Sequence, residues 1–201
     1  MTVKEVADSA ERHHRIRRLL ALIRSIAAQI QIPDRDPEES ASHLAGRGGA
    51  IGRAALAPIT AGTDLESLVL DELLVHRLHR SGIIVDGPTV LLKAKSAEIM
   101  GLLMHELVTN SVKFGALSQS QTRLRVVWWF CGPGGSRLHF EWGESGVQMP
   151  LATGKRPGFG SQVVKRLIAR ELHGEGDMLF LGEGVLCTVE FPAGEALLAY
   201  E

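Results

Sequence analysis

The chain has 201 residues, of which 45% are hydrophobic, and its 22 basic and 23 acidic residues give a net charge of −1. This length and composition allow one medium domain with a small appendage or two small domains with a real core. The balanced charge argues against nucleic acid or an anionic membrane as the main partner. Cys131 and Cys187 show neither a disulfide framework nor a metal-ligand spacing, and no apolar run approaches the roughly 18 residues of a spanning helix. We therefore expect a cytoplasmic protein with reduced thiols, no membrane insertion and no room for a large sensory domain.

The N-terminal segment predicts a long amphipathic helix over residues 3–30. Its apolar residues from Ile16 to Ile30 alternate steps of four and three, which is typical of the seam of a coiled coil or helical bundle. Pro33 and Pro37 end this helix.

A second, weaker helix is predicted over residues 38–56, where four glycines each cost about 1 kcal/mol relative to alanine. Such a helix needs a neighbour, so we expect a hairpin over residues 1–59 that forms a homodimer, with a monomer left open. The glycine cluster GRGGAIG does not fit a dinucleotide loop, because no strand precedes it and Ile51 stands where the third glycine is needed.

The pattern changes near Pro58 and Gly62, and residues 60–201 predict a separate domain. Helical periodicity alternates there with runs of β-branched and aromatic residues, and the turn CGPGG joins two of these runs as a hairpin. The fold class is therefore α+β, with a helical hairpin followed by an α/β sandwich that contains a mixed, largely antiparallel sheet. The predicted helices are 64–80, 96–114 and 160–172, and the predicted strands are 82–88, 123–130, 136–142, 178–181 and 185–191.

The helix over residues 96–114 carries an unusual polar stripe. Glu106, Thr109, Asn110 and Lys113 share one face of a helix whose other positions are apolar. Unpartnered buried polar groups would cost roughly several kcal/mol, so the stripe either pairs internally, Glu106 with Asn110 and Lys113, or faces a charged ligand. An amide oxygen such as that of Asn110 is a suitable neutral ligand for Mg²⁺.

A long stretch without periodicity ends in Gly158, Phe159 and Gly160 at the start of a helix. Glycines at this place let backbone N–H groups approach a phosphate, and the helix N-terminus favours negative charge. Lys155 and Arg156 would add positive charge, although each of these features is common by itself. Long structureless loops in compact domains are usually functional.

Four segments in the same order resemble the HWE group of sensor histidine kinases. HELVTNSVKFGALS resembles the N box with His105, FEWGESG resembles the Trp-x-Glu motif with Trp142 and Glu144, and GFGSQVVKRLIARELHGEG resembles the G2 box. ERHHRIRRLLALIRSIA resembles the phosphoacceptor segment. The resemblance runs from about Glu11 to Pro192 and implies a GHKL-type ATP-binding domain after a phosphoacceptor hairpin.

The resemblance implies a role for each matched residue. His14 would accept the phosphoryl group, which fits its place on the outer face of the first helix, whereas His13 lies on the apolar seam; an ordinary surface histidine is the alternative. Asn110 would bind Mg²⁺, Lys113 would contact phosphate, and Glu144 would accept from the adenine amino group. Glu106 would orient a water or assist the imidazole proton. The other matched nucleotide-site positions are Gly146, Gly158, Phe159, Gly160 and Ser161. For His105 and Trp142, core packing is the default expectation.

The function implied by the resemblance is an ATP- and Mg²⁺-dependent histidine kinase that passes its phosphoryl group to a response regulator. The alternative is a scaffold or phosphotransfer protein that keeps His14 without using ATP. Arg18 replaces the asparagine of the phosphoacceptor motif, and the segment ESGVQMP lacks a second glycine and an early proline. With no sensory domain expected, the input would arrive through a separate partner or through oligomeric state.

Overall fold

The computed structural model describes residues 45–49, 62–75, 82–148, 161 and 163–200. Several predicted features lie outside these ranges: the first helix, His14, the domain boundary after residue 59 and the loop over residues 149–160.

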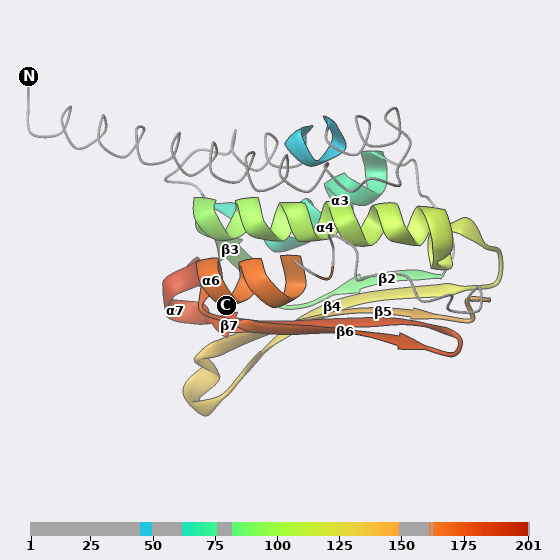
Figure 1. Cartoon of the computed structure of the whole chain (residues 1–201). Helices are drawn as coiled ribbons and strands as arrows, with labels where there is room; N and C mark the ends of the chain where they lie inside the picture. The colour runs from blue at the N-terminus through green and yellow to red at the C-terminus, as the bar shows by residue number, and fades with distance from the viewer. Residues whose placement is uncertain (1–44, 50–61, 76–81, 149–160, 162, 201) are drawn as a thin grey trace, which may run out of the picture.

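A five-stranded sheet forms the centre of the described part, with the strand order β2-β4-β5-β7-β6 (Figure 1). β2 runs parallel to β4, and the three other neighbouring pairs are antiparallel. The α+β class and the mixed, largely antiparallel sheet are therefore confirmed. The strands are β2 (Ile83–Asp86), β4 (Arg123–Cys131), β5 (Arg137–Ser145), β6 (Glu175–Leu181) and β7 (Gly184–Pro192).

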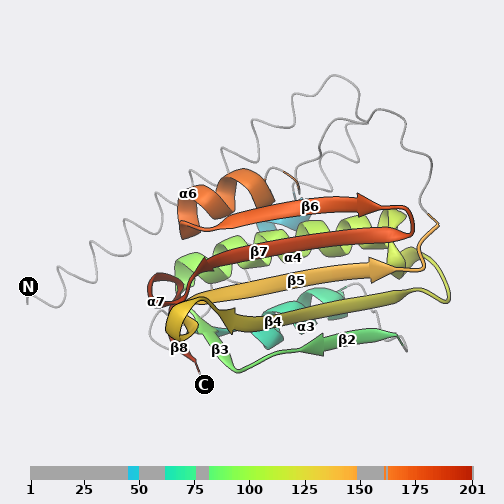
Figure 2. The same ribbon diagram turned by 90° about the horizontal axis from the view of Figure 1, so that it is seen from below.

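The two faces of the sheet have different environments. Along β4, Leu124, Val126 and Trp128 point into the core, because alternate side chains of a strand lie on the same face. Trp129 points the other way, is 39% exposed and stacks on His139 at 4.3 Å between ring centroids. Viewed from below, the strands lie in front of the helices (Figure 2), so the described helices cover one face only.

The long helix α4 (Ala94–Phe114) lies along the covered face, beside η3 (Val163–Leu167) and α6 (Ile168–Leu172). Its apolar residues, among them Leu103 and Leu107, are buried in the core. α4 begins two residues before the predicted start and ends at the predicted residue. The helix ends where Gly115 adopts an extended conformation and its N–H donates to the Ser111 carbonyl oxygen at 2.9 Å.

Two further helical segments lie near α4. α3 (Leu65–Val75) packs against it, and residues 45–49 form a short helical segment on the side of α4 away from the sheet (Figure 1). α4 is thus enclosed between the sheet and other helices, which explains why 14 of its residues, from Ser96 to Ser111, are buried.

A second, three-stranded sheet was not predicted. Its strand order is β1-β3-β8, and both pairings are antiparallel. These strands have only two to four residues and show no periodicity, so their sequences carry little signal. None of the helices in the described ranges has the length and apolar character needed to cross a bilayer. The missed elements are β1 (Thr63–Asp64), β3 (Val90–Leu92), α7 (Ala193–Ala196) and β8 (Leu197–Tyr200).

Candidate functional site

The first part of the polar stripe on α4 is satisfied by a distant partner. The Glu106 carboxylate accepts hydrogen bonds from Arg47 Nε at 2.5 Å and from Arg47 Nη2 at 3.1 Å. Both residues are only 5% exposed. The expected partners of Glu106, Asn110 and Lys113, are not the ones that bind it here, because a two-donor guanidinium matches the carboxylate geometry better than an amide or an ammonium does.

His105 also has a buried acidic partner. Its Nδ1 lies 2.7 Å from Oε1 of Glu72, a residue of α3. The opposite side of the imidazole faces Gly46, where an added Cβ would lie 2.6 Å from His105 Nε2. His105 therefore does more than fill the core: it joins α4 to α3 and lies directly against the segment 45–49.

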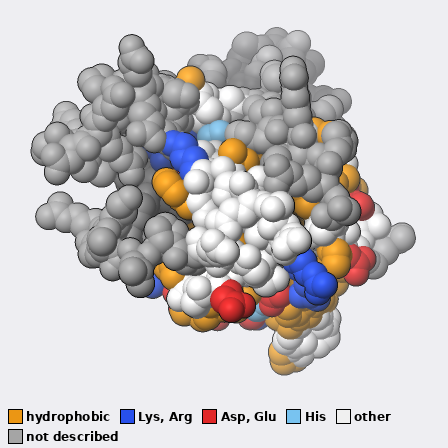
Figure 3. Space-filling view, turned by 90° about the vertical axis from the view of Figure 1, so that its right-hand side faces the viewer, with side chains coloured by type: hydrophobic (Ala, Val, Ile, Leu, Met, Phe, Trp, Pro, Cys, Tyr) orange, Lys and Arg blue, Asp and Glu red, His pale blue; other side chains and the backbone are white. Residues whose placement is uncertain are grey.

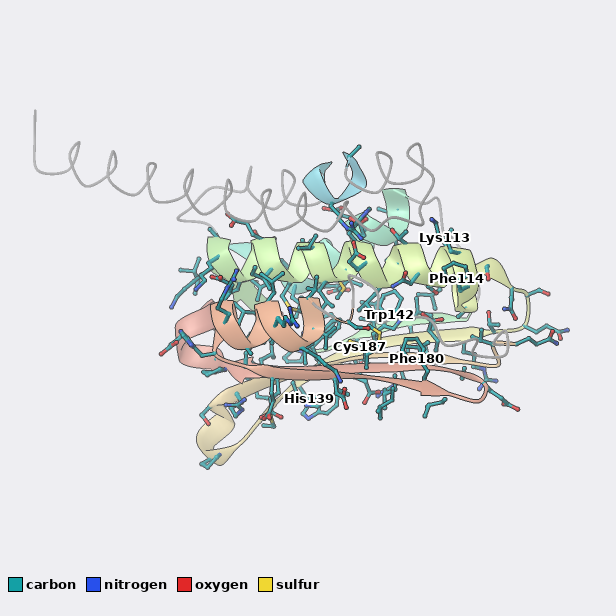
Figure 4. All side chains as sticks on the ribbon, in the orientation of Figure 1. Lys113, Phe114, His139, Trp142, Phe180 and Cys187 are labelled. Carbon is teal, nitrogen blue, oxygen red and sulfur yellow. The ribbon has the colours of Figure 1, made fainter. Side chains whose placement is uncertain are left out.

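The C-terminal part of the stripe is open. Asn110 and Lys113 are exposed, in contrast to the eight residues 101–108 that precede Thr109 and are all buried. Figure 4 shows Lys113 near the C-terminal end of α4, on the side away from the sheet. Thr109 Oγ1 is buried and has no hydrogen-bond partner among the described residues. This half of α4 thus presents the Asn110 amide and the Lys113 ammonium at the surface.

Glu144 lies at the end of α4 and is held by two hydrogen bonds. Its Oε1 accepts from Trp142 Nε1 at 2.8 Å, and its Oε2 accepts from the Ala116 backbone N–H at 2.7 Å. The side chain is nearly buried, with 7% of the residue exposed. Trp142 lies between α4 and the sheet (Figure 4), so its indole both fills the core and orients this carboxylate.

Gly115 makes this arrangement possible. A Cβ at position 115 would overlap Glu144 Oε2, so the carboxylate can reach the Ala116 N–H only over a glycine. Each carboxylate oxygen has a further lone pair, which leaves Glu144 able to accept a hydrogen bond from an adenine amino group. The geometry is compatible with the predicted role but also gives Glu144 a structural one.

The remaining predicted nucleotide-site residues are partly described. Gly146 adopts φ +74°, a conformation that L residues rarely adopt, in the turn after β5. Ser161 is helical, and its hydroxyl lies 3.7 Å from the Met178 sulfur on β6. Gly158, Phe159 and Gly160, like His14, lie outside the described residues.

A cavity of about 570 Å³ opens near the C-terminal end of α4, beside the segment that follows this helix. Its described lining is uncharged and about equally polar and apolar, with Ser118, Gln119 and Gln121 beside Ile83 and Leu117, and it contains none of the predicted site residues. Figure 3 shows this end: the visible atoms of described residues are mainly neutral, with separate basic and acidic side chains.

The residues present fit a magnesium nucleotide. Mg²⁺ prefers oxygen ligands and keeps several waters, which an exposed amide oxygen allows. The described residues contain no cluster of three or more His, Cys, Asp or Glu that would hold a metal by itself. A metal at Asn110 would therefore depend on oxygens from its ligand, as it does when substrate phosphates complete the shell.

Sequence reasoning missed the hydrogen-bond partners of Glu106, His105 and Glu144. The partners Arg47 and Glu72 lie 59 and 33 residues before the residues they bind. The third, the Ala116 N–H, is a backbone group. A lone arginine within a glycine cluster and two adjacent polar residues at buried positions of α4 were the only signals.

Comparison with curated proteins gives relatives of one kind. A blue-light-activated histidine kinase of Rhizobium johnstonii is 30% identical over 183 residues, which are 90% of this chain and 51% of that protein. A blue-light-activated histidine kinase of Brucella ovis is 28% identical over 194 residues, 92% of this chain and 38% of that protein. The chain thus spans about half, or less, of the length of these relatives. No protein-family model matches it.

Solved structures show the same fold. The blue-light-activated histidine kinase EL346 of Erythrobacter litoralis superposes with a TM-score of 0.60 at 20% identity, covering 97% of this chain and 62% of that one. The isolated histidine kinase domain of the same protein gives 0.57 at 18% identity, covering 92% and 95%.

Proposed function

We propose that this chain is a histidine kinase of the HWE type, which autophosphorylates His14 from Mg-ATP and passes the phosphoryl group to a response regulator; its similarity to blue-light-activated histidine kinases supports this. The observation that carries this proposal is the open half of α4. Asn110 and Lys113 are exposed, whereas His105 and Glu106, about one to two turns earlier on the same helix, are buried.

The proposed reaction is an in-line transfer. An imidazole nitrogen of His14 attacks the γ-phosphorus, the bond from phosphorus to the β–γ bridging oxygen breaks, and ADP leaves. Mg²⁺ would neutralise charge on the phosphate oxygens. Asn110 would hold that ion, Lys113 would contact the phosphates, and the backbone of Gly158 to Ser161 would cradle them.

Glu144 would recognise the base. Its carboxylate is already oriented by the Trp142 indole and the Ala116 N–H, so little reorganisation is needed when a further donor arrives. An adenine amino group is such a donor.

The product would be a phosphohistidine, and a receiver-domain aspartate of a response regulator is its proposed acceptor. We also propose that the chain forms a homodimer through residues 1–59 and that a separate partner regulates it. We propose further that residues 1–59 and 60–201 form two domains.

Incubation with γ-labelled ATP and Mg²⁺ tests the proposal. We expect acid-labile, base-stable label on the wild type and on the control His13→Gln, and none on His14→Gln. Label on His14→Gln would place the acceptor elsewhere. No label on the wild type, together with no ATP binding, would contradict a kinase and favour a scaffold that keeps His14 without using ATP.

A further inference from the structure

Two adjacent residues of α4 are held from outside the helix. His105 pairs with Glu72 of α3, and Glu106 pairs with Arg47 of the segment 45–49. All four side chains are buried. A buried charge that loses its partner is strongly unfavourable, so these pairs resist relative movement of the three segments.

The fit between the segment 45–49 and α4 is tight as well as ionic. A Cβ on Gly46 would come within 2.6 Å of His105 Nε2 and 2.7 Å of Cε1, closer than real Cβ contacts allow. A Cβ on Gly48, two residues later, would meet no atom of the described residues within 4 Å. The glycine at position 46 is therefore needed for contact, while the glycine at position 48 is not.

Glu106 and Asn110 are four residues apart, which places them one above the other on the same face of α4. The anchored residue and the proposed magnesium ligand thus belong to successive turns of one rigid element. A displacement of α4 at Glu106 would be carried to Asn110, and misplacing a catalytic group by about 1 Å can cost about a hundredfold in rate.

We propose that Arg47 is a positioning residue, which ties the segment 45–49 to α4 through Glu106 and so holds Asn110 in place for the nucleotide. Gly46 completes the contact because its missing side chain leaves room for the imidazole ring of His105. Both Glu106 oxygens accept from Arg47, which makes Glu106 the anchor of this contact. The segment 45–49 lies within residues 1–59, for which the sequence predicts the hairpin. The proposal rests on the proposed kinase function.

Four variants of the full chain test the anchor. Arg47→Met removes the guanidinium, Glu106→Gln removes the charge of its partner, and the double variant combines them. Gly46→Ala keeps every charge but places a methyl group against His105. Gly48→Ala is the matched control, because it gains the same helix propensity without a new contact to any described residue.

Two readouts separate positioning from stability. Mg-ATP affinity and autophosphorylation rate are measured well below each variant's melting temperature. Backbone amide exchange over residues 109–114 is measured without nucleotide, so it reports on α4 even if the chain binds no ATP.

We expect Arg47→Met and Gly46→Ala to weaken Mg-ATP binding at least about fivefold, the lower end of typical coupling between sites. Amide exchange over residues 109–114 should be faster in both variants and unchanged in Gly48→Ala. The double variant should bind Mg-ATP about as weakly as Arg47→Met alone, because both substitutions break the same contact between Arg47 and Glu106.

Unchanged exchange and affinity in Arg47→Met, with only a lower melting temperature, would reduce the pair to a structural contact and overturn the proposal. Faster autophosphorylation in Arg47→Met, abolished by adding Glu106→Gln, would overturn it differently, by making Glu106 a proton acceptor that Arg47 blocks. If the wild type bound no Mg-ATP, the proposed function would fail, and the exchange data alone would still decide whether Arg47 anchors α4.

Discussion

The two halves of α4 treat the same kinds of side chain in opposite ways. His105 and Glu106 are buried and paired with Glu72 and Arg47, whereas Asn110 and Lys113, one and two turns later, are exposed. All four belong to one polar stretch of sequence. The polar residues of this helix therefore divide into a buried pair that fixes the helix and an exposed pair for which we propose a ligand, and only their surroundings distinguish them.

The largest expected effect is on stability and comes from a substitution in the buried half of α4. Glu106→Ala removes the carboxylate that accepts both hydrogen bonds described for the buried Arg47 guanidinium, so we expect the free energy of unfolding to fall by about 3 kcal/mol. Asn110→Ala, in the open half, should change it by less than about 0.5 kcal/mol. Urea unfolding followed by circular dichroism measures both values.

The contrast between the two variants, rather than either value alone, is decisive. Equal losses of stability would mean that the two halves of α4 do not differ in the way described.

A smaller effect concerns the point where α4 ends. Trp142→Phe removes the N–H that donates to Glu144 Oε1 and leaves a buried carboxylate oxygen short of a partner. Such a loss costs about 1–3 kcal/mol, and we expect about 2 kcal/mol in the free energy of unfolding. Trp129→Phe, on the open face of the sheet, is the control and should cost less than about 1 kcal/mol. A stability equal to the wild type in Trp142→Phe would show that the indole does not hold Glu144.

The smallest effect concerns the Cys187 thiol and shows whether the core between α4 and the sheet is closed to solvent. Burial raises the pKa of the Cys187 thiol from its ordinary value of 9.0 to about 12. The folded state therefore favours the protonated thiol: its contribution to stability is complete below about pH 9 and is lost as the pH rises toward 12. Cys131, at the end of β4, is only partly buried.

Iodoacetamide labelling at pH 8 should accordingly modify Cys131 in the folded protein and Cys187 only after denaturation. Rapid labelling of Cys187 in the folded state would mean that the core under α4 opens to solvent. The exposure of Asn110 would then reflect this opening of the whole core and not a feature of its own half of α4.

The sequence was sufficient for the large elements. The runs around Val126 and Phe140 are rich in β-branched and aromatic residues, so both strands of the central hairpin were predicted within a few residues. α4 was predicted from its apolar periodicity. The short strands β1, β3 and β8 were missed because two to four residues cannot display a period.

The division within the polar stripe could not be predicted from sequence. Pairing of Glu106 inside its own helix and pairing with a ligand were both open, but the actual partner, Arg47, lies 59 residues away in a glycine-rich segment. Similarly, Trp142 was expected only to pack in the core, because the predicted strand ended at residue 142 and did not include Glu144. In the structure β5 continues to Ser145, so these two residues share one face of the strand and the indole N–H reaches the carboxylate.

Calorimetric titration of Mg-ATP into the wild type and Asn110→Ala tests the central claim most directly, namely that the open half of α4 holds a magnesium nucleotide. The wild type should bind one nucleotide, more tightly with Mg²⁺ than with EDTA, and Asn110→Ala should lose that gain from Mg²⁺ while keeping its stability. Absence of binding by the wild type, or an unchanged Mg²⁺ dependence in Asn110→Ala, would contradict the account.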